Sequence, residues 1–567
     1  MGVPVQTVRR FGETSMRACI LLLLISAGAA LSVSAPADAQ DAVALTGKVS
    51  SAQESAMEGV LVSARLDGSN VTTSVVSNAQ GTYSFPAERL QPGRYTLSIR
   101  AIGYRLGGPK SVEVGGDRGA TDITLVKATA LANQLSNAEW LQSLPGDDKN
   151  KRALFDCVDC HTLQRVVQST HDAEDLIKVF HRMGTYTYNS SPTHPQVLPP
   201  GGPTSYRPKI APALEQQMAE YLAGINLSNA EALSFPLKTF PRLTGRSTRV
   251  IITEYDLPRR DAQPHDVIVD ADGIVWYSDF DHQFVGEMDP ATGKVTDHPL
   301  PVMRPENPKG ALGLEVDPQG NLWLSAMHQS GLYKFERKTR RVTAYPFPQE
   351  WLTPTSQSSM VSPEHSDVDG KVWTNNQDSR EHYRLDVATG KYENLGLTVD
   401  KDGKRLAAYG MPADLANNIY LLNFGGANIG RRDAKTNEIT SWNTLRPSSR
   451  PRRGRVDADN VLWFAEYGGN AIGRFDPRTN VIKEWQLPTP WGNPYDVVRT
   501  RNGEVWAGSM MSDRVSRLDP STDSIVEYQL PRPTNIRRVF VDEHSARPVL
   551  WVGSNHGGSI VKVEPLD

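Results

Sequence analysis

The sequence predicts a mainly β protein in which a small helical domain separates two β domains. Short alternating runs broken by glycine occupy residues 43–128, amphipathic helical stretches fill 129–230, and an aromatic marker recurs every 43 to 50 residues through 249–567. We therefore expect an N-terminal β-sandwich, a small α-helical domain and a C-terminal seven-bladed β-propeller. The 567 residues carry a net charge of −3 and a mean hydropathy of −0.43. These values give no sign of a basic nucleic-acid footprint or of a polytopic membrane protein.

The first 39 residues have the pattern of a cleavable export signal. Three arginines, Arg9, Arg10 and Arg17, precede an apolar stretch at 19–31, and the small residues Ala37-Asp38-Ala39 follow as a cleavage box. No later stretch reaches 18 apolar residues, so we expect no integral membrane span. The mature chain is predicted to be periplasmic or secreted.

Residues 43–128 contain short strand-like runs separated by glycine turns, such as Gly59-Val60-Leu61-Val62 and Gly93-Arg94-Tyr95-Thr96-Leu97. This pattern resembles the carboxypeptidase regulatory-like family of seven-stranded sandwiches. The resemblance implies the fold and a role as a spacer or docking module. No cluster of histidines or carboxylates in this stretch suggests a metal site.

The central segment carries the motif Cys157-Val158-Asp159-Cys160-His161. C-x-x-C-H is the attachment site of a c-type haem: two thiols one helical turn apart form thioethers, and the adjacent imidazole reaches the iron. A zinc site would need two more ligands, and the mature chain has no further cysteine. A redox or disulfide C-x-x-C is the other alternative, and the adjacent histidine argues against it. We predict one covalent haem c, held by Cys157 and Cys160, with His161 as proximal ligand.

The sequence after the motif resembles short cytochrome c domains of the quinohaemoprotein type. A predicted helix over 172–183 ends in Met183 just before a glycine, and a second helix follows over 214–222. The resemblance implies that Met183 is the sixth iron ligand, which raises the reduction potential. The alternatives are His171, His181, Met218 or an open site. A proline-rich loop over 191–208 separates the two helices.

Residues 249–567 repeat with the period of a four-stranded propeller blade. The chain ends without the outer strand of the last repeat, and residues 252–258 supply the missing copy before the first. We therefore expect the ring to close by pairing the first strand into the last blade. The repeating aromatic markers are Trp276, Trp323, Trp373, Tyr420, Trp463, Trp506 and Trp551.

The blade pattern, with Asp-x-x-Gly-x-x-Trp and Ile-Gly-Arg-x-Asp-Pro, resembles the streptogramin B lyase family. The resemblance implies metal-assisted elimination by a Pro-His and a Glu-x-His at the innermost strands of the last two blades. Here those positions read Pro494-Tyr495 and Asn535-Ile536-Arg537, and Pro264-His265 stands in the first blade instead. The catalytic set is therefore not matched, which disfavours the lyase reaction.

The innermost strands place four candidate residues around the mouth of the propeller channel: His265, Arg452, Tyr495 and Arg537. Arginines in a funnel favour an anionic or polar small-molecule ligand. The alternative is that these arginines and their neighbours Arg453 and Arg538 pair with carboxylates such as those of Asp266, Asp414 and Asp496.

Three functions remain open from the sequence. The first is a periplasmic oxidoreductase in which the propeller binds a ligand and the haem exchanges electrons with a donor or acceptor. The second is a streptogramin B lyase-like C–O lyase with an accessory haem domain, and the third is a non-enzymatic redox relay or scaffold. The fold alone does not choose between them.

Overall fold

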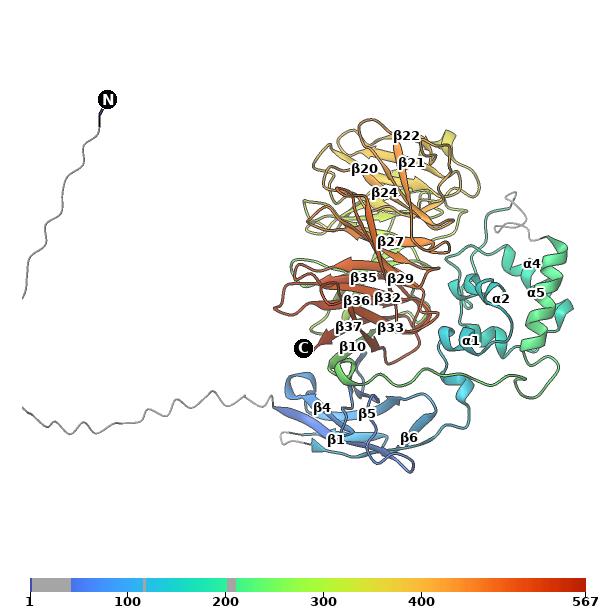
Figure 1. Cartoon of the computed structure of the whole chain (residues 1–567), viewed down its shortest axis with the longest axis vertical. Coiled ribbons are helices and arrows are strands. Elements are labelled where there is room, and N and C mark those ends of the chain that lie inside the picture. The colour runs from blue at the N-terminus through green and yellow to red at the C-terminus, as the bar shows by residue number, and fades with distance from the viewer. Residues whose placement is uncertain (3–41, 116–118, 201–210) are drawn as a thin grey trace, which may run out of the picture. The chain divides into compact units, whose positions relative to one another are not determined.

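The computed structural model describes residues 1–2, 42–115, 119–200 and 211–567 (Figure 1). The predicted export signal and residues 201–208 of the predicted loop lie outside this part. Residues 42–567 form one compact unit. Within the described residues, no helix is long and apolar enough to cross a membrane. The mainly β character predicted from the sequence is confirmed.

The N-terminal strands form two sheets whose apolar faces enclose one core. In one sheet β4, β1, β9 and β6 are neighbours in that order, and β8 pairs with β1; in the other, β3, β2, β5 and β7 are neighbours. Alternation in β5 buries Tyr95 and Leu97 and leaves Thr96 and Ser98 exposed, as a half-buried strand requires. The elements are β1 (Val43–Ser51), β2 (Leu61–Leu66), β3 (Val71–Val76), β4 (Thr82–Pro86), η1 (Ala87–Arg89), β5 (Gly93–Arg100), β6 (Tyr104–Gly108), β7 (Ser111–Val114), β8 (Gly119–Ala120) and β9 (Ile123–Lys127).

Short helices form the segment that follows. Ser136 begins α1 with a capping box shared with Glu139, and the Asp172 side chain caps α4 by accepting from the Asp175 N–H. The core of this segment contains the fully buried Trp140 and extends to Met511 of the propeller. The elements are η2 (Leu131–Gln134), α1 (Asn137–Ser143), α2 (Asp148–Arg152), η3 (Phe155–Asp159), α3 (Leu163–Val167), α4 (Ala173–Gly184), α5 (Pro212–Ile225) and η4 (Gly245–Thr248).

The rest of the chain forms seven antiparallel four-stranded blades, of which six are continuous in sequence. The first blade contains β11 (Pro264–Val269), β12 (Val275–Asp279), β13 (Phe284–Asp289) and β14 (Lys294–Pro299), and the second contains β15 (Leu314–Val316), β16 (Leu322–Ser325), β17 (Gly331–Glu336) and β18 (Arg341–Pro346), followed by η5 (Gln349–Trp351). The third contains β19 (Val361–Ser362), β20 (Lys371–Asn376), β21 (Glu381–Asp386) and β22 (Lys391–Leu397), and the fourth contains β23 (Ala408–Gly410), β24 (Ile419–Asn423), β25 (Asn428–Arg432) and β26 (Ile439–Asn443). The fifth contains β27 (Pro451–Val456), β28 (Leu462–Glu466), β29 (Ala471–Asp476) and β30 (Val481–Gln486), and the sixth contains β31 (Pro494–Arg499), β32 (Val505–Ser509), β33 (Arg514–Asp519) and β34 (Ser524–Gln529).

The seventh blade joins the two ends of the repeat region. It contains β35 (Ile536–Asp542), β36 (Val549–Ser554) and β37 (Ser559–Pro565), and β10 (Val250–Asp256) pairs antiparallel with β37 as its outer strand. The other side of β10 pairs with β3 of the sandwich, which makes one eight-stranded sheet (Figure 1). The predicted closure of the ring is present, and the continuation into the sandwich was not predicted.

In three of the blades, a recurring aspartate and tryptophan have a local physical role. In the first blade, one oxygen of Asp270 accepts the N–H groups of the turn, and the other accepts from the Trp276 indole nitrogen at 2.8 Å. Asp317 binds Trp323 in the same way at 2.9 Å, and Asp457 binds Trp463 at 2.9 Å. The motif therefore satisfies a tight turn and a buried indole with a single carboxylate.

Candidate functional site

The C-x-x-C-H motif lies at the end of η3, a 3-10 helix and not the α-helix expected from the sequence. Val158 is buried, while Cys157 and Cys160 are half-buried thiols. The half-buried His161 ring has Nδ1 3.0 Å from the Thr162 carbonyl oxygen, which accepts from it in the Nδ1–H tautomer. That tautomer leaves the lone pair on Nε2, the state that a metal-binding imidazole needs.

The propeller holds this motif by its main chain. The Asn535 side-chain amide donates to the Val158 carbonyl oxygen at 3.0 Å. Arg537 donates to the Asp159 carbonyl oxygen at 3.0 Å and lies 3.4 Å from its carboxylate. Asn535 immediately precedes β35, the innermost strand of the last blade, and Arg537 is the second residue of that strand. The two residues between the cysteines are therefore anchored to the mouth of the channel.

The structure brings the four predicted channel residues together. The Tyr495 hydroxyl lies 3.2 Å from Nε2 of His265, and the Arg452 guanidinium lies 4.0 Å from the centre of the Tyr495 ring. Arg537 lies 5.4 Å from the same ring. Burial lowers the pKa of His265 to about 4, so this ring is neutral in the folded protein.

Most of the positive charge near the channel is neutralised internally. Arg453 makes a bidentate pair with Asp266 at 2.6 and 2.9 Å, and Arg538 pairs with Glu315 at 2.6 Å. Asp496 pairs with Arg455 and Asp414 with Arg431. Carboxylate pairing, the alternative considered from the sequence, therefore accounts for Arg453 and Arg538. Arg537 instead meets Asp159 of the motif.

Arg452 differs from its neighbours because, within the described residues, no carboxylate forms an ion pair with it. Four aromatic rings surround the guanidinium at centroid distances of 4.0 to 5.3 Å, and Nη1 lies 3.7 Å from the Met510 sulfur. Cation–π contacts of this kind stabilise a desolvated cation by about 0.5–2 kcal/mol each. The rings belong to Tyr409, Phe424, Tyr467 and Tyr495.

His556 is a residue of this region that sequence reasoning missed. It lies in the turn between β36 and β37, and both of its ring nitrogens are buried. Burial lowers its pKa to about 3, and the positive charge of Arg537 adds to the effect. In the sequence it stands in Asn555-His556-Gly557-Gly558, which reads as an exposed turn, so no signal set it apart.

Met183 lies half-buried in the last turn of α4, which packs against α5. Its role as an iron ligand stays a prediction. The described part of the following loop, up to residue 200, runs along the propeller, where the Gln196 side chain accepts from the Lys309 N–H at 2.7 Å. This loop places His194 against the first blade.

Comparisons with known proteins cover the two β regions. Residues 397–566 match the virginiamycin B lyase family, and residues 44–126 match the carboxypeptidase regulatory-like domain. A solved virginiamycin B lyase from Staphylococcus aureus is 21% identical, with a TM-score of 0.48, over 56% of this chain and 99% of that one. A streptogramin B lyase structure is also 21% identical, with a TM-score of 0.48, over 57% of this chain and 100% of its own. No curated protein matches the chain.

Proposed function

We propose that the chain is an exported c-type cytochrome with one covalent haem, which exchanges electrons with a periplasmic donor or acceptor. In this proposal the propeller holds the haem-bearing segment against its channel mouth. The observation that carries the proposal is the anchoring of Val158 and Asp159, between the two cysteines, by Asn535 and Arg537.

The residues of the motif fit a haem. Two half-buried thiols flank a main chain that the propeller fixes, and the Thr162 carbonyl favours the His161 tautomer with its lone pair on Nε2. Cys157 and Cys160 would hold the porphyrin, and His161 and Met183 would bind the iron. When bound, the group supplies one-electron chemistry at a potential set by its axial ligands.

The surrounding residues would act on that chemistry through position and charge. Asn535 and Arg537 fix the carbonyl groups between the cysteines, which limits movement of both thiols. The positive charge of Arg452, held in its buried aromatic site, interacts electrostatically with the Asp159 carboxylate. A buried cation near a redox group favours its reduced state, because charge is screened weakly in a low-dielectric interior.

The residues at the catalytic positions of the resembled family argue against the lyase alternative. Tyr495 and Arg537 stand where the resembled family has its catalytic histidines, and neither provides an imidazole base. Arg537 is also committed to Asp159 of the motif. The Tyr495 phenol and the Arg537 guanidinium, which is already hydrogen-bonded to Asp159, do not supply the general base that such an elimination needs.

The test is to produce the full chain with the cytochrome c maturation system and measure covalent haem by pyridine haemochrome. We expect one haem per chain, and none in the Cys157→Ala/Cys160→Ala variant. Ser169→Ala in the same helical segment is the matched control and should keep its haem. Reduction of the oxidised protein is then followed anaerobically with periplasmic fractions. Absence of covalent haem in the wild-type chain would overturn the proposal.

A further inference from the structure

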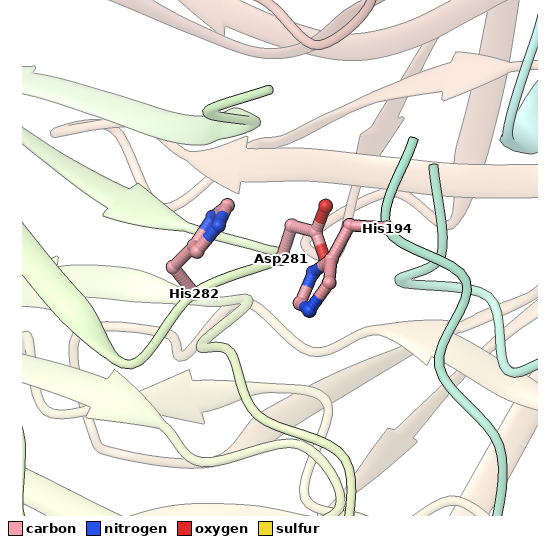
Figure 2. Close-up of side chains that lie close together, drawn as sticks. All are labelled: His194, Asp281 and His282. Carbon is pink, nitrogen blue, oxygen red and sulfur yellow. The ribbon is translucent and has the colours of Figure 1, made fainter. Parts of the chain in front are cut away.

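Two histidines and an aspartate from distant parts of the chain meet at the edge of the first blade (Figure 2). They are His194, in the loop after α4, and Asp281 and His282, between β12 and β13. Their ligand atoms all lie within 4.8 Å of one another. We infer that these three side chains bind a divalent transition-metal ion of the zinc type, independently of the proposed haem.

The backbone that carries Asp281 and His282 is fixed before any ion binds. One oxygen of Asp279 accepts the N–H groups of both residues at 3.1 Å. The other oxygen of Asp279 pairs with Arg259 at 2.6 Å. The charge of Asp279 is thus compensated, while its position holds the two candidate ligands on one tight turn.

Asp281 is a buried carboxylate directed at His194. Its side chain is 0% exposed, and burial raises its pKa. One oxygen lies 2.6 Å from Nδ1 of His194 and 2.8 Å from the Gln196 side-chain nitrogen, which donates to it. A metal ion would replace the proton shared by His194 and Asp281, and Gln196 would remain as the partner that orients the carboxylate.

His282 supplies the second imidazole. Its ring stacks on that of His194, with centroids 5.1 Å apart and planes at 12°. Among the described residues no hydrogen bond reaches its buried Nδ1, and the nearest carboxylate oxygen, of Asp279, is 3.5 Å away. This nitrogen faces the Asp279 carboxylate, and a bound metal ion would take the place of that ion pair.

The geometry requires only a small local movement. Tetrahedral zinc with bonds of about 2.0–2.1 Å needs ligand atoms about 3.3 Å apart. The side chain of His194 is 44% exposed and can rotate, so that its Nδ1, now 2.6 Å from the Asp281 oxygen, moves outward from Asp281 and toward His282. Two imidazoles and one carboxylate leave a fourth position for water, a donor set that suits zinc. The ion would fasten the loop that follows Met183 to the propeller.

The test uses the full-length holoprotein after treatment with EDTA. Zinc chloride is titrated in by calorimetry, and bound zinc is counted by mass spectrometry separately from iron. We expect one zinc ion per chain, bound at micromolar or lower Kd, and affinity at least tenfold weaker in His194→Gln, Asp281→Asn and His282→Gln. His298→Gln, a histidine of the same blade paired with Glu287, is the matched control and should bind like the wild type.

Because His194 is half-exposed, His194→Gln should keep the thermal unfolding temperature of the EDTA-treated wild type. That comparison separates loss of a ligand from loss of the fold. Zinc uptake that is equal in the wild type and in the His194→Gln/His282→Gln variant would overturn the inference. So would a wild-type chain that takes up no zinc at micromolar concentration.

Discussion

Arg537 donates to the main-chain carbonyl oxygen of Asp159 at 3.0 Å, across 378 residues of sequence. The contact joins the innermost strand of the last blade to the midpoint of the C-x-x-C pair. Asn535 adds a second bond to the neighbouring carbonyl. The position of the two cysteines therefore depends on the closed propeller and not only on the short helices around them.

Removing this anchor should loosen the motif while leaving the blades intact. For Arg537→Met we expect a loss of about 1–3 kcal/mol in the free energy of unfolding, because a charged donor is removed from two partly buried acceptor oxygens of Asp159. Amide hydrogen exchange should rise in residues 155–161. Arg547→Met, at an exposed arginine of the same blade, should change neither value. Unchanged exchange in Arg537→Met would mean that the anchor does not hold the motif.

Replacing Met183 should change the potential of the proposed haem. A thioether ligand favours ferrous iron, so Met183→His should lower the midpoint potential by an amount on the order of 0.1 V, within the range of about 0.8 V that axial ligands span. Met218→Leu, at a partly buried methionine of α5, is the matched control. Spectroelectrochemical titration measures both. An equal potential in wild type and Met183→His would assign the sixth ligand elsewhere.

Local patterns were sufficient to predict the blades. In three blades an aspartate six residues before the tryptophan closes the turn and binds the indole, as Asp270 and Trp276 show, so this part of the repeat is visible without tertiary information. The C-x-x-C-H motif is also local. The four channel residues followed from the register of the innermost strands, and His265 and Tyr495 do meet.

Contacts between segments far apart in the chain could not be predicted from the sequence. Nothing near Asp159 indicates that Arg537 binds it, and nothing near His194 indicates that it forms a hydrogen bond with Asp281, 87 residues later. The aromatic site of Arg452 draws its rings from several blades, so no spacing rule reveals it. The first two contacts depend on how the helical segment packs on the propeller, and the aromatic site depends on how the blades are arranged around one another. Periodicity encodes neither arrangement.

A buried ion pair links the sandwich to the propeller. Arg100 binds Asp513 at 2.7 Å, with side chains 11% and 2% exposed. We expect Arg100→Met to lower the free energy of unfolding by about 3–5 kcal/mol, because it leaves the Asp513 carboxylate buried and without its cation. Arg94→Met removes an exposed pair with Asp67 and should cost no more than about 1 kcal/mol. Chemical denaturation compares the two, and equal losses would contradict the prediction.

Buried histidines should make the protein sensitive to acid. Burial lowers the pKa of His556 to about 3 and of His265 to about 4, against about 6.5 in the unfolded chain. The unfolded state therefore binds more protons below pH 6.5, so stability is full above that pH and falls as the pH drops toward 4. His556→Asn should reduce the slope of stability against pH by about 1.4 kcal/mol per unit between pH 4.5 and 6. Denaturation at several pH values tests this, with exposed His544→Asn as control; equal slopes in all three proteins would refute it.

The double pairing of β10 has a consequence for how the chain matures. The chain is synthesised from its N-terminus, so β10 is available long before β37, its partner in the last blade. β3 and β10 both emerge before any blade is complete, so they can pair during that interval. Pairing with β3 covers one edge of β10 and holds the strand in place, while its other edge stays open until β37 pairs with it. Folding is then expected to be rate-limited by the late arrival of the C-terminal strand, a contact of very long range.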